Sequence, residues 1–256
     1  MVFEKTRQPP SKLVLLLRGI AKGEPTAHLA RELNIGRRRV HQLRQQVQCN
    51  LLSTRPTEPL PDDVLEADEL YQNAGEKSEP HRDPADRSRR RANKRRGHGT
   101  YETDRPPIFS VKGRASGKVR YFVRHHADGA TCLAVVKAAA HQQARVLNTD
   151  DWKGYTKVEA KLNLQHATVR HGRPGSGQRE WARDDDGDGV RVVRCNGCEG
   201  AGTGLLSYLR VFRGVHKKYL DHYVATYETM TNAKQFTAAV LQRMRFSKLE
   251  SQSKDT

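Results

Sequence analysis

Apolar residues recur at helical spacing through the first fifty residues of the chain. The apolar face of the first predicted helix, over residues 12–22, is formed by Leu13, Leu16, Leu17 and Ile20. Ser11 and Thr26 are placed to cap the first and second helices. The second helix is predicted over 27–33 and the third over 37–48, on either side of a tight turn at 34–36. The pattern predicts a small all-α unit whose last two helices follow the order of a helix-turn-helix.

The middle of the chain changes to the period of strands. Residues 64–71 alternate apolar and acidic side chains, which predicts a strand with Asp68 near its middle or end. Two further strands, 108–113 and 118–124, are joined by the turn at 114–117. The remaining predicted elements are a helix over 131–141, a strand at 146–147, a mostly helical stretch over 152–164 and a strand over 166–169. This order predicts an α/β fold with a mixed sheet.

The overall charge of the chain narrows the possible partners. The formal net charge is +17, only 36% of the 256 residues are hydrophobic, and the mean hydropathy is -0.82. A surface this basic favours a polyanionic partner, and nucleic acid is favoured over a membrane. No apolar run is long enough to span a bilayer and no signal peptide is recognised, so we expect no membrane partner. Four scattered cysteines do not form a secreted disulfide framework, which favours a reducing cytoplasm.

Two clusters of basic residues are candidates for DNA contact. The first lies at the start of the predicted recognition helix and consists of Arg37, Arg38, Arg39, His41 and Arg44. The alternative for this cluster is a helical hairpin with a solvated basic face. The second cluster lies in the proline-flanked stretch 87–96, a predicted mobile arm that can contact phosphates. Its candidate DNA-binding residues are Arg89, Arg90, Arg91, Lys94, Arg95 and Arg96.

The segment 145–155 carries the first candidate for catalysis. A short apolar run ends in Thr149-Asp150, and an amphipathic segment follows at once. The tips of strands are where sites are built in open α/β sheets, so Asp150 is a candidate site residue. The alternative is that residues 149–151 only cap a helix.

Two other motifs resemble metal sites but lack ligands. Asp184-Asp185-Asp186-Gly187-Asp188-Gly189 matches the start of a calcium loop, but Cys195 stands where the bidentate Glu is needed, which favours an acidic hairpin turn. Cys195 and Cys198 have C-x-x-C spacing, but a structural zinc needs about four ligands and no second such pair is present. These two cysteines are therefore predicted to pack at a helix start.

Glu199 supplies a third acid at or just inside a helix start. Together with Asp68 and Asp150 it gives the order Asp, Asp, Glu along a strongly basic chain. Hard cations take oxygen ligands, and two Mg²⁺ ions can promote phosphodiester displacement. The sequence therefore predicts a Mg²⁺ site, with Mn²⁺ as a substitute and two ions expected, held by Asp68, Asp150 and Glu199.

Several blocks of the chain, in the same order, resemble bacterial insertion-sequence DDE transposases of the ISXO type. The matching blocks are 67–71, 75–77, 89–99, 148–155, 179–189 and 212–215. In that family the first Asp lies in a D-E-x-Y strand and the second in a T-D-x-W-x-G-Y segment, which correspond here to Asp68 and Asp150. The third acid follows an Asn by three residues, which corresponds to Glu199 and makes Asn196 a supporting residue. The likeness is weaker after Glu199, where Gly202 replaces the usual Trp.

The resemblance implies an integrase-type, RNase H-like catalytic core, a mixed sheet flanked by helices. It implies metal-dependent nicking at the ends of an insertion sequence, followed by 3′-hydroxyl strand transfer into target DNA. The partners would be the terminal repeats and the target DNA, bound by a homo-oligomer in the bacterial cytoplasm, on the nucleoid. The competing hypothesis is a catalytically degenerate relative that only binds DNA.

The expected domain organisation combines both kinds of inference. We expect a helix-turn-helix DNA-binding domain over 1–50, a linker over 51–64, a catalytic domain over 65–228 with a basic disordered insertion at about 78–105, and a tail over 229–256.

Overall fold

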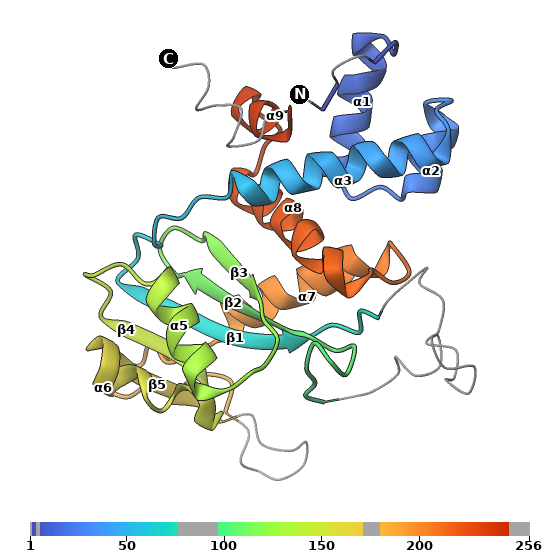
Figure 1. Ribbon diagram of the computed structural model, residues 1–256. Coiled ribbons are helices and arrows are strands. Elements are labelled where there is room, and N and C mark those ends of the chain that lie inside the picture. The colour runs from blue at the N-terminus through green and yellow to red at the C-terminus, as the bar shows by residue number, and fades with distance from the viewer. Residues whose placement is uncertain (1, 4–5, 76–96, 171–179, 246–256) are drawn as a thin grey trace, which may run out of the picture. The chain divides into compact units, whose positions relative to one another are not determined.

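The computed structural model describes residues 2–3, 6–75, 97–170 and 180–245. The chain forms two compact units, each of which is considered by itself (Figure 1). The helical unit combines both ends of the chain, Met1–Pro56 and Ser207–Thr256, and the sheet unit comprises Thr57–Leu206. The boundary between the units falls inside the helix α7 (Asn196–Arg210).

The three helices predicted near the N-terminus are present. They are α1 (Pro10–Ala21), α2 (Thr26–Glu32) and α3 (Arg37–Ser53). The predicted caps are wrong, because neither α1 nor α2 has a side-chain cap hydrogen bond. Pro9 and Pro25 occupy the two N-cap positions and already hold extended backbone angles, so the chain enters each helix without a hydroxyl cap.

The turn between α2 and α3 is set by Asn34, which has a φ of 49°. Asn tolerates this left-handed conformation better than most residues. The following Ile35 is buried and its N–H donates to the carbonyl of Ala30 at 3.0 Å, which fixes the turn against α2. The two helices and the short turn predicted from the sequence are therefore present.

The C-terminal part of the chain is helical and belongs to the helical unit. It contains η2 (Lys217–Tyr219), α8 (Leu220–Ala233) and α9 (Ala238–Arg245). Val240 and Met244 of α9 are buried in the same apolar core as Leu43 and Val47 of α3. Asn50 also donates a 3.0 Å hydrogen bond to the carbonyl of Met244.

The domain boundaries expected from the sequence need correction accordingly. The expected linker 51–64 includes the end of α3, and the expected tail 229–256 includes the end of α8 and all of α9. Residues 207–228, expected in the catalytic domain, belong to the helical unit. The reason is that apolar positions on α8 and α9 complete the core of the N-terminal helices, which short-range periodicity does not reveal.

The sheet unit contains five strands in the order β3-β2-β1-β4-β5. The strands are β1 (Val64–Tyr71), β2 (Pro107–Gly113), β3 (Val119–Val123), β4 (Val146–Asp150) and β5 (Gln165–Val169). β1, β2 and β3 pair in antiparallel fashion, whereas β4 is parallel to both β1 and β5. An antiparallel meander extended by two parallel strands is the RNase H-like arrangement, which confirms the predicted fold class.

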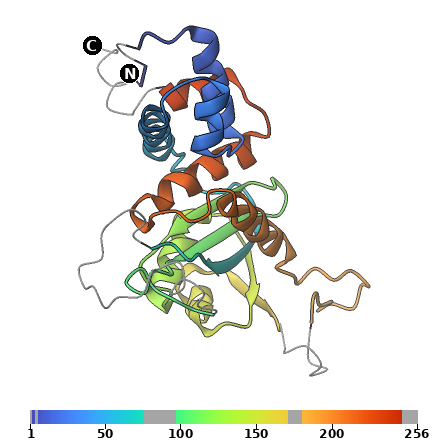
Figure 2. The ribbon, with the colours of Figure 1, turned by 90° about the vertical axis from the view of Figure 1, so that its right-hand side faces the viewer.

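Helices cover both faces of this sheet (Figures 1 and 2). One face carries α5 (Gly129–Ala139), η1 (Lys153–Tyr155) and α6 (Val158–Leu162). The first turns of α7 lie on the other face. Because side chains alternate along a strand, Leu65 and Ala67 of β1 enter the core beneath α5, and Glu66 and Asp68 point to the face with α7.

Candidate active site

Asp68 and Asp150 lie on the same face of two adjacent parallel strands. The register of β1 and β4 pairs Val64 with Val146 and Glu66 with Asn148. Asp68 of β1 and Asp150 of β4 each follow the last pair of this register by two residues. Adjacent strands are about 4.8 Å apart, so like-charged side chains near each other on such strands interact strongly.

The first turn of α7 adds Glu199 to this pair. Glu199 is half-buried, and its negative charge acts on Asp68, as does that of Asp150. Three residues further along α7, Gly202 lies so close to β1 that an added Cβ would be 3.1 Å from Cδ2 of Leu70. The lack of a side chain at Gly202 therefore allows a close approach of helix and strand.

Burial and the neighbouring acids act on the ionisation of Asp68. Burial and the charge of Asp150 raise the pKa of Asp68 to about 7, and Glu199 adds to the increase. A hydrogen bond of 2.9 Å from the N–H of Glu69 to Oδ1 of Asp68 opposes this increase. Asp150 and Glu199 thus both interact with Asp68, and a single site made of the three acids stays a prediction.

Glu69 is a fourth carboxylate near the site that the sequence analysis missed. Burial and the charges of Asp150 and Asp68 raise the pKa of Glu69 to about 8. The hydroxyl of Tyr155 donates to Oε2 of Glu69 at 3.4 Å, from the face of the sheet that carries α5. The sequence signal for Glu69 was its position next to Asp68 in the same predicted strand. Consecutive residues of a strand point to opposite faces, so the two acids lie on opposite faces of the sheet.

The donor set fits hard divalent cations. All three acids offer carboxylate oxygens, and their mutual repulsion is the kind of electrostatic cost that a bound cation relieves. The oxygens of Asp68, Asp150 and Glu199 are not among the described groups of three ligands gathered within 4.8 Å of one another. A pair of ions about 3.5–4 Å apart does not need such close gathering, since its outer ligands bind different ions.

The main chain around Asp150 holds the carboxylate in place. The N–H of Trp152 donates to Oδ1 of Asp150 at 3.2 Å. The helix-cap alternative for residues 149–151 is wrong, because η1 begins at Lys153 without a side-chain cap hydrogen bond. Asp151, the next residue, is exposed and forms an ion pair with Arg170 at 3.2 Å.

Cys195 and Cys198 fasten the start of α7 to β1. The Sγ of Cys195 donates to the carbonyl of Ala67 at 3.2 Å, and the Sγ of Cys198 donates to the carbonyl of Glu66 at 3.0 Å. A hydrogen bond with Cys198, together with burial, raises the pKa of Cys195 well above its ordinary value. Cys195 thus stays protonated at neutral pH, and the predicted packing role of this pair agrees with its burial.

The acidic loop at 184–189 forms a turn. Oδ1 and Oδ2 of Asp184 accept 2.8 Å hydrogen bonds from the N–H groups of Gly187 and Gly189. Arg183 and Val193 form an isolated antiparallel bridge across the loop, as an acidic hairpin turn requires. Cys195, at the position of the missing calcium ligand, is buried against β1. Asn196, the predicted supporting residue, is exposed at the first position of α7.

Of the residues at the start of α3 that were predicted to bind DNA, Arg44 is the one that the structure contradicts, because it is buried. Arg37, Arg38, Arg39 and His41 are exposed on α3. Arg44 is fully buried, and its Nε donates to Oγ1 of Thr26 at 3.1 Å while its guanidinium lies 5.4 Å from the ring centre of Phe212. Arg44 points inward because its position on α3 faces the turn that starts α2. The second predicted cluster, Arg89, Arg90, Arg91, Lys94, Arg95 and Arg96, lies outside the described residues.

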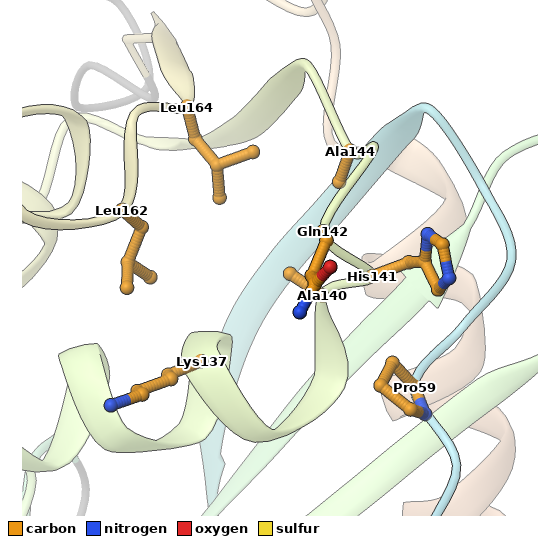
Figure 3. A pocket seen from close by; sticks show the side chains of 8 residues that line it. All are labelled: Pro59, Lys137, Ala140, His141, Gln142, Ala144, Leu162 and Leu164. Carbon is orange, nitrogen blue, oxygen red and sulfur yellow. The ribbon is translucent and has the colours of Figure 1, made fainter.

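A pocket of about 610 Å³ lies at the opposite edge of the sheet (Figure 3). Pro59, Ala144 and Leu164 line it, and they lie in the segments that lead into the strands β1, β4 and β5. The acids, in contrast, lie in the middle of β1 and at the carboxyl end of β4. The pocket is therefore separate from the candidate site.

Comparison with known proteins finds sequence similarity to a protein in a transposable element. No protein-family model matches the chain. The chain is 27% identical over 164 residues to an uncharacterized protein in the transposable element ISH50 of Halobacterium salinarum. That alignment covers 64% of this chain and 50% of the relative, so the chain spans about half the length of the curated relative it matches.

Solved structures give weak similarities. The catalytic core domain of BIV integrase aligns at 11% identity with a TM-score of 0.37, over 76% of this chain and 98% of that chain. A simian T-cell lymphotropic virus intasome complex aligns at 11% identity with a TM-score of 0.41, over 91% and 75%. The Mos1 strand transfer complex aligns at 12% identity with a TM-score of 0.26, over 91% and 82%. The fold assignment therefore rests on the strand order and register of this chain.

Within the described ranges, no helix combines the length and apolar character needed to cross a membrane.

Proposed function

We propose that this protein is an insertion-sequence DNA transposase of the DDE class, of the ISXO type that its sequence blocks resemble. The observation that carries the proposal is that the charges of Asp150 and Glu199 both act on the buried Asp68, on adjacent strands and the covering helix of an RNase H-like sheet. The relative from a transposable element supports the same class of function.

In this proposal Asp68, Asp150 and Glu199 hold two divalent cations, Mg²⁺ or Mn²⁺. When bound, such ions activate the attacking oxygen and stabilise the leaving oxygen of a phosphodiester displacement. The N–H groups of Glu69 and Trp152 orient the carboxylates of Asp68 and Asp150. Water would attack the phosphorus at the element end and displace the 3′-oxygen, which leaves as a 3′-hydroxyl. That hydroxyl would then attack a phosphorus of the target DNA, form a new phosphodiester bond and displace the 3′-oxygen of the target strand as a hydroxyl.

DNA would be held through its phosphates. The exposed Arg37, Arg38 and Arg39 at the start of α3 are proposed to contact the DNA backbone, together with His41 and the basic residues of the segment 89–96. We further propose that a homo-oligomer pairs the two element ends, because transposition requires both ends to be cut and joined.

The test is an assay of cleavage and strand transfer by the full chain, with DNA that flanks its gene and with Mg²⁺ or Mn²⁺. The wild type is expected to cut and join DNA only with the metal, and Asp150→Asn is expected to lower the rate by roughly a hundred-fold or more. Asp62→Asn is the matched control, since Asp62 is a buried carboxylate of the same unit that accepts hydrogen bonds from Ser116.

Full cleavage and strand-transfer activity of Asp150→Asn would contradict the assignment. Salt-sensitive DNA binding by the wild type without any metal-dependent cleavage would instead favour a relative that only binds DNA.

A further inference from the structure

Glu66 is a buried carboxylate outside the proposed metal-binding set. It lies two residues before Asp68 on the same face of β1 and is 4% exposed. Its Oε1 accepts a 3.0 Å hydrogen bond from Nε of Arg114, and its Oε2 accepts a 3.1 Å hydrogen bond from the N–H of Cys198. A buried carboxylate needs such partners, so these contacts determine where the side chain lies.

The contact with Cys198 is made to the first turn of α7. The first N–H groups of a helix lack partners within the helix, and a carboxylate at that end is also favoured by the helix dipole. Gly197, one residue earlier, lies so close that an added Cβ would be 2.4 Å from Oε2 of Glu66. Lys112 on β2 donates to the carbonyl of Gly197 at 3.3 Å. The helix start is therefore held against β1 and β2.

Arg114 extends the attachment to the segment that leads into α7. Besides Glu66, its guanidinium donates to the carbonyls of Val192 at 2.7 Å and Arg194 at 2.9 Å. One side chain thus joins the carboxylate on β1 to the chain immediately before the helix. Glu199 follows Cys198 directly, so the same attachment holds the backbone from which the Glu199 side chain extends.

We propose that Glu66 is a positioning residue that acts through Glu199, by fixing the first turn of α7 so that Glu199 faces Asp68. This role of Glu66 rests on the proposed function, in which Asp68 and Glu199 are metal ligands. Glu66 itself contacts neither substrate nor metal in this scheme. Residues that orient metal ligands commonly contribute about 10–100-fold to metal affinity.

A soft-metal centre is the other possible use of this cluster. The ligand atoms of Glu66, Cys195 and Cys198 lie within 4.8 Å of one another. Each of them already has a partner, however, since both thiols donate to main-chain carbonyls and the carboxylate accepts from Arg114. The contacts therefore favour an attachment of the helix over a zinc site.

The test measures binding of Mn²⁺ alone to the full chain, in the wild type, Glu66→Gln, Glu199→Gln and the double variant. Glu66→Gln is expected to weaken Mn²⁺ binding by about ten-fold in the wild-type background and to have no further effect beside Glu199→Gln. Glu66→Ala should weaken binding more than Glu66→Gln, because Gln still accepts a hydrogen bond from the N–H of Cys198. Glu228→Gln, which neutralises a buried carboxylate of the helical unit bonded to Arg55, should bind Mn²⁺ as the wild type does.

Unchanged Mn²⁺ binding by Glu66→Gln would overturn the proposal, as would an equal loss in both backgrounds. Stoichiometric zinc in the purified wild type, lost in Cys198→Ser, would also overturn it. Should Glu66→Ala fail to fold, the melting temperature shows this and Glu66→Gln carries the test. A wild type that binds no Mn²⁺ contradicts the proposed function itself. Equal Mn²⁺ binding by the wild type and the Glu66→Gln variant contradicts only the role of Glu66.

Discussion

Asp68 and Asp150 lie two residues beyond the paired Glu66 and Asn148 on neighbouring parallel strands, and the charge of Asp150 acts on Asp68. Burial and the charge of Asp150 raise the pKa of Asp68 to about 7. Without a cation, this arrangement destabilises the folded protein whenever both acids are ionised.

The first prediction concerns the stability of the metal-free protein against pH. The folded-state pKa values are about 7 for Asp68 and about 8 for Glu69, whereas the ordinary values are 3.8 and 4.5. At a pH between the ordinary and the folded-state values, the folded protein therefore binds more protons than the unfolded protein. The free energy of unfolding should therefore fall as the pH rises from about 4 to 8. Asp68→Asn should raise it by on the order of 1–3 kcal/mol at pH 8 and by little at pH 4. Urea unfolding in EDTA at both pH values measures this, and equal effects at the two would contradict it.

The second prediction concerns metal addition. Millimolar Mg²⁺ should raise the melting temperature more at pH 8 than at pH 5, because the carboxylates must lose their protons to bind the ion. Asp150→Asn should remove most of this increase, whereas Asp186→Asn, in the exposed turn at 184–189, should leave it unchanged. Thermal scans with Mg²⁺ and with EDTA test the pair. The opposite ranking would move the metal site to the acidic turn.

The third prediction separates two arginines of α3. Arg44→Ala removes a fully buried side chain bonded to Thr26 and should lower the free energy of unfolding by about 3 kcal/mol. Arg38→Ala removes an exposed side chain and should change it by less than about 0.5 kcal/mol. Under the proposed function, Arg38→Ala should also reduce the salt dependence of DNA binding by about one phosphate contact. Equal destabilisation by the two substitutions would contradict the burial of Arg44.

The fourth prediction compares two glycines of α7. An added Cβ at Gly200 meets nothing within 4 Å, so Gly200→Ala should stabilise the helix by about 0.5–1 kcal/mol. At Gly202 the added Cβ would be 3.1 Å from Leu70, so Gly202→Ala should gain less or destabilise. Chemical denaturation of both variants gives the comparison. A larger gain at Gly202 would show that α7 lies farther from β1.

Local periodicity was enough to predict the sheet and its acids. The alternation in 64–71 and the apolar run before Asp150 predicted β1 and β4, and both strands are present. These two strands pair in parallel as neighbours up to Glu66 and Asn148, two residues before Asp68 and Asp150. Such patterns report the nearest few residues of the chain, and they succeed where burial follows the repeat of one element.

Contacts between distant segments escaped the same reasoning. Nothing near Glu66 in the sequence indicates its bond to Cys198, and nothing near Arg44 indicates that the turn before α2 covers it. Likewise, the apolar positions of α9 complete a core whose other members lie two hundred residues earlier. These features depend on which surfaces meet, so sequence periodicity alone cannot supply them.

The most direct test of the central claim is a crystal structure of the full chain grown with Mn²⁺, in which anomalous scattering locates the ions. The account predicts Mn²⁺ bound by carboxylate oxygens of Asp68, Asp150 and Glu199 together. Mn²⁺ bound elsewhere, with any two of these carboxylates more than about 10 Å apart, would contradict it, since one two-metal site cannot span that distance.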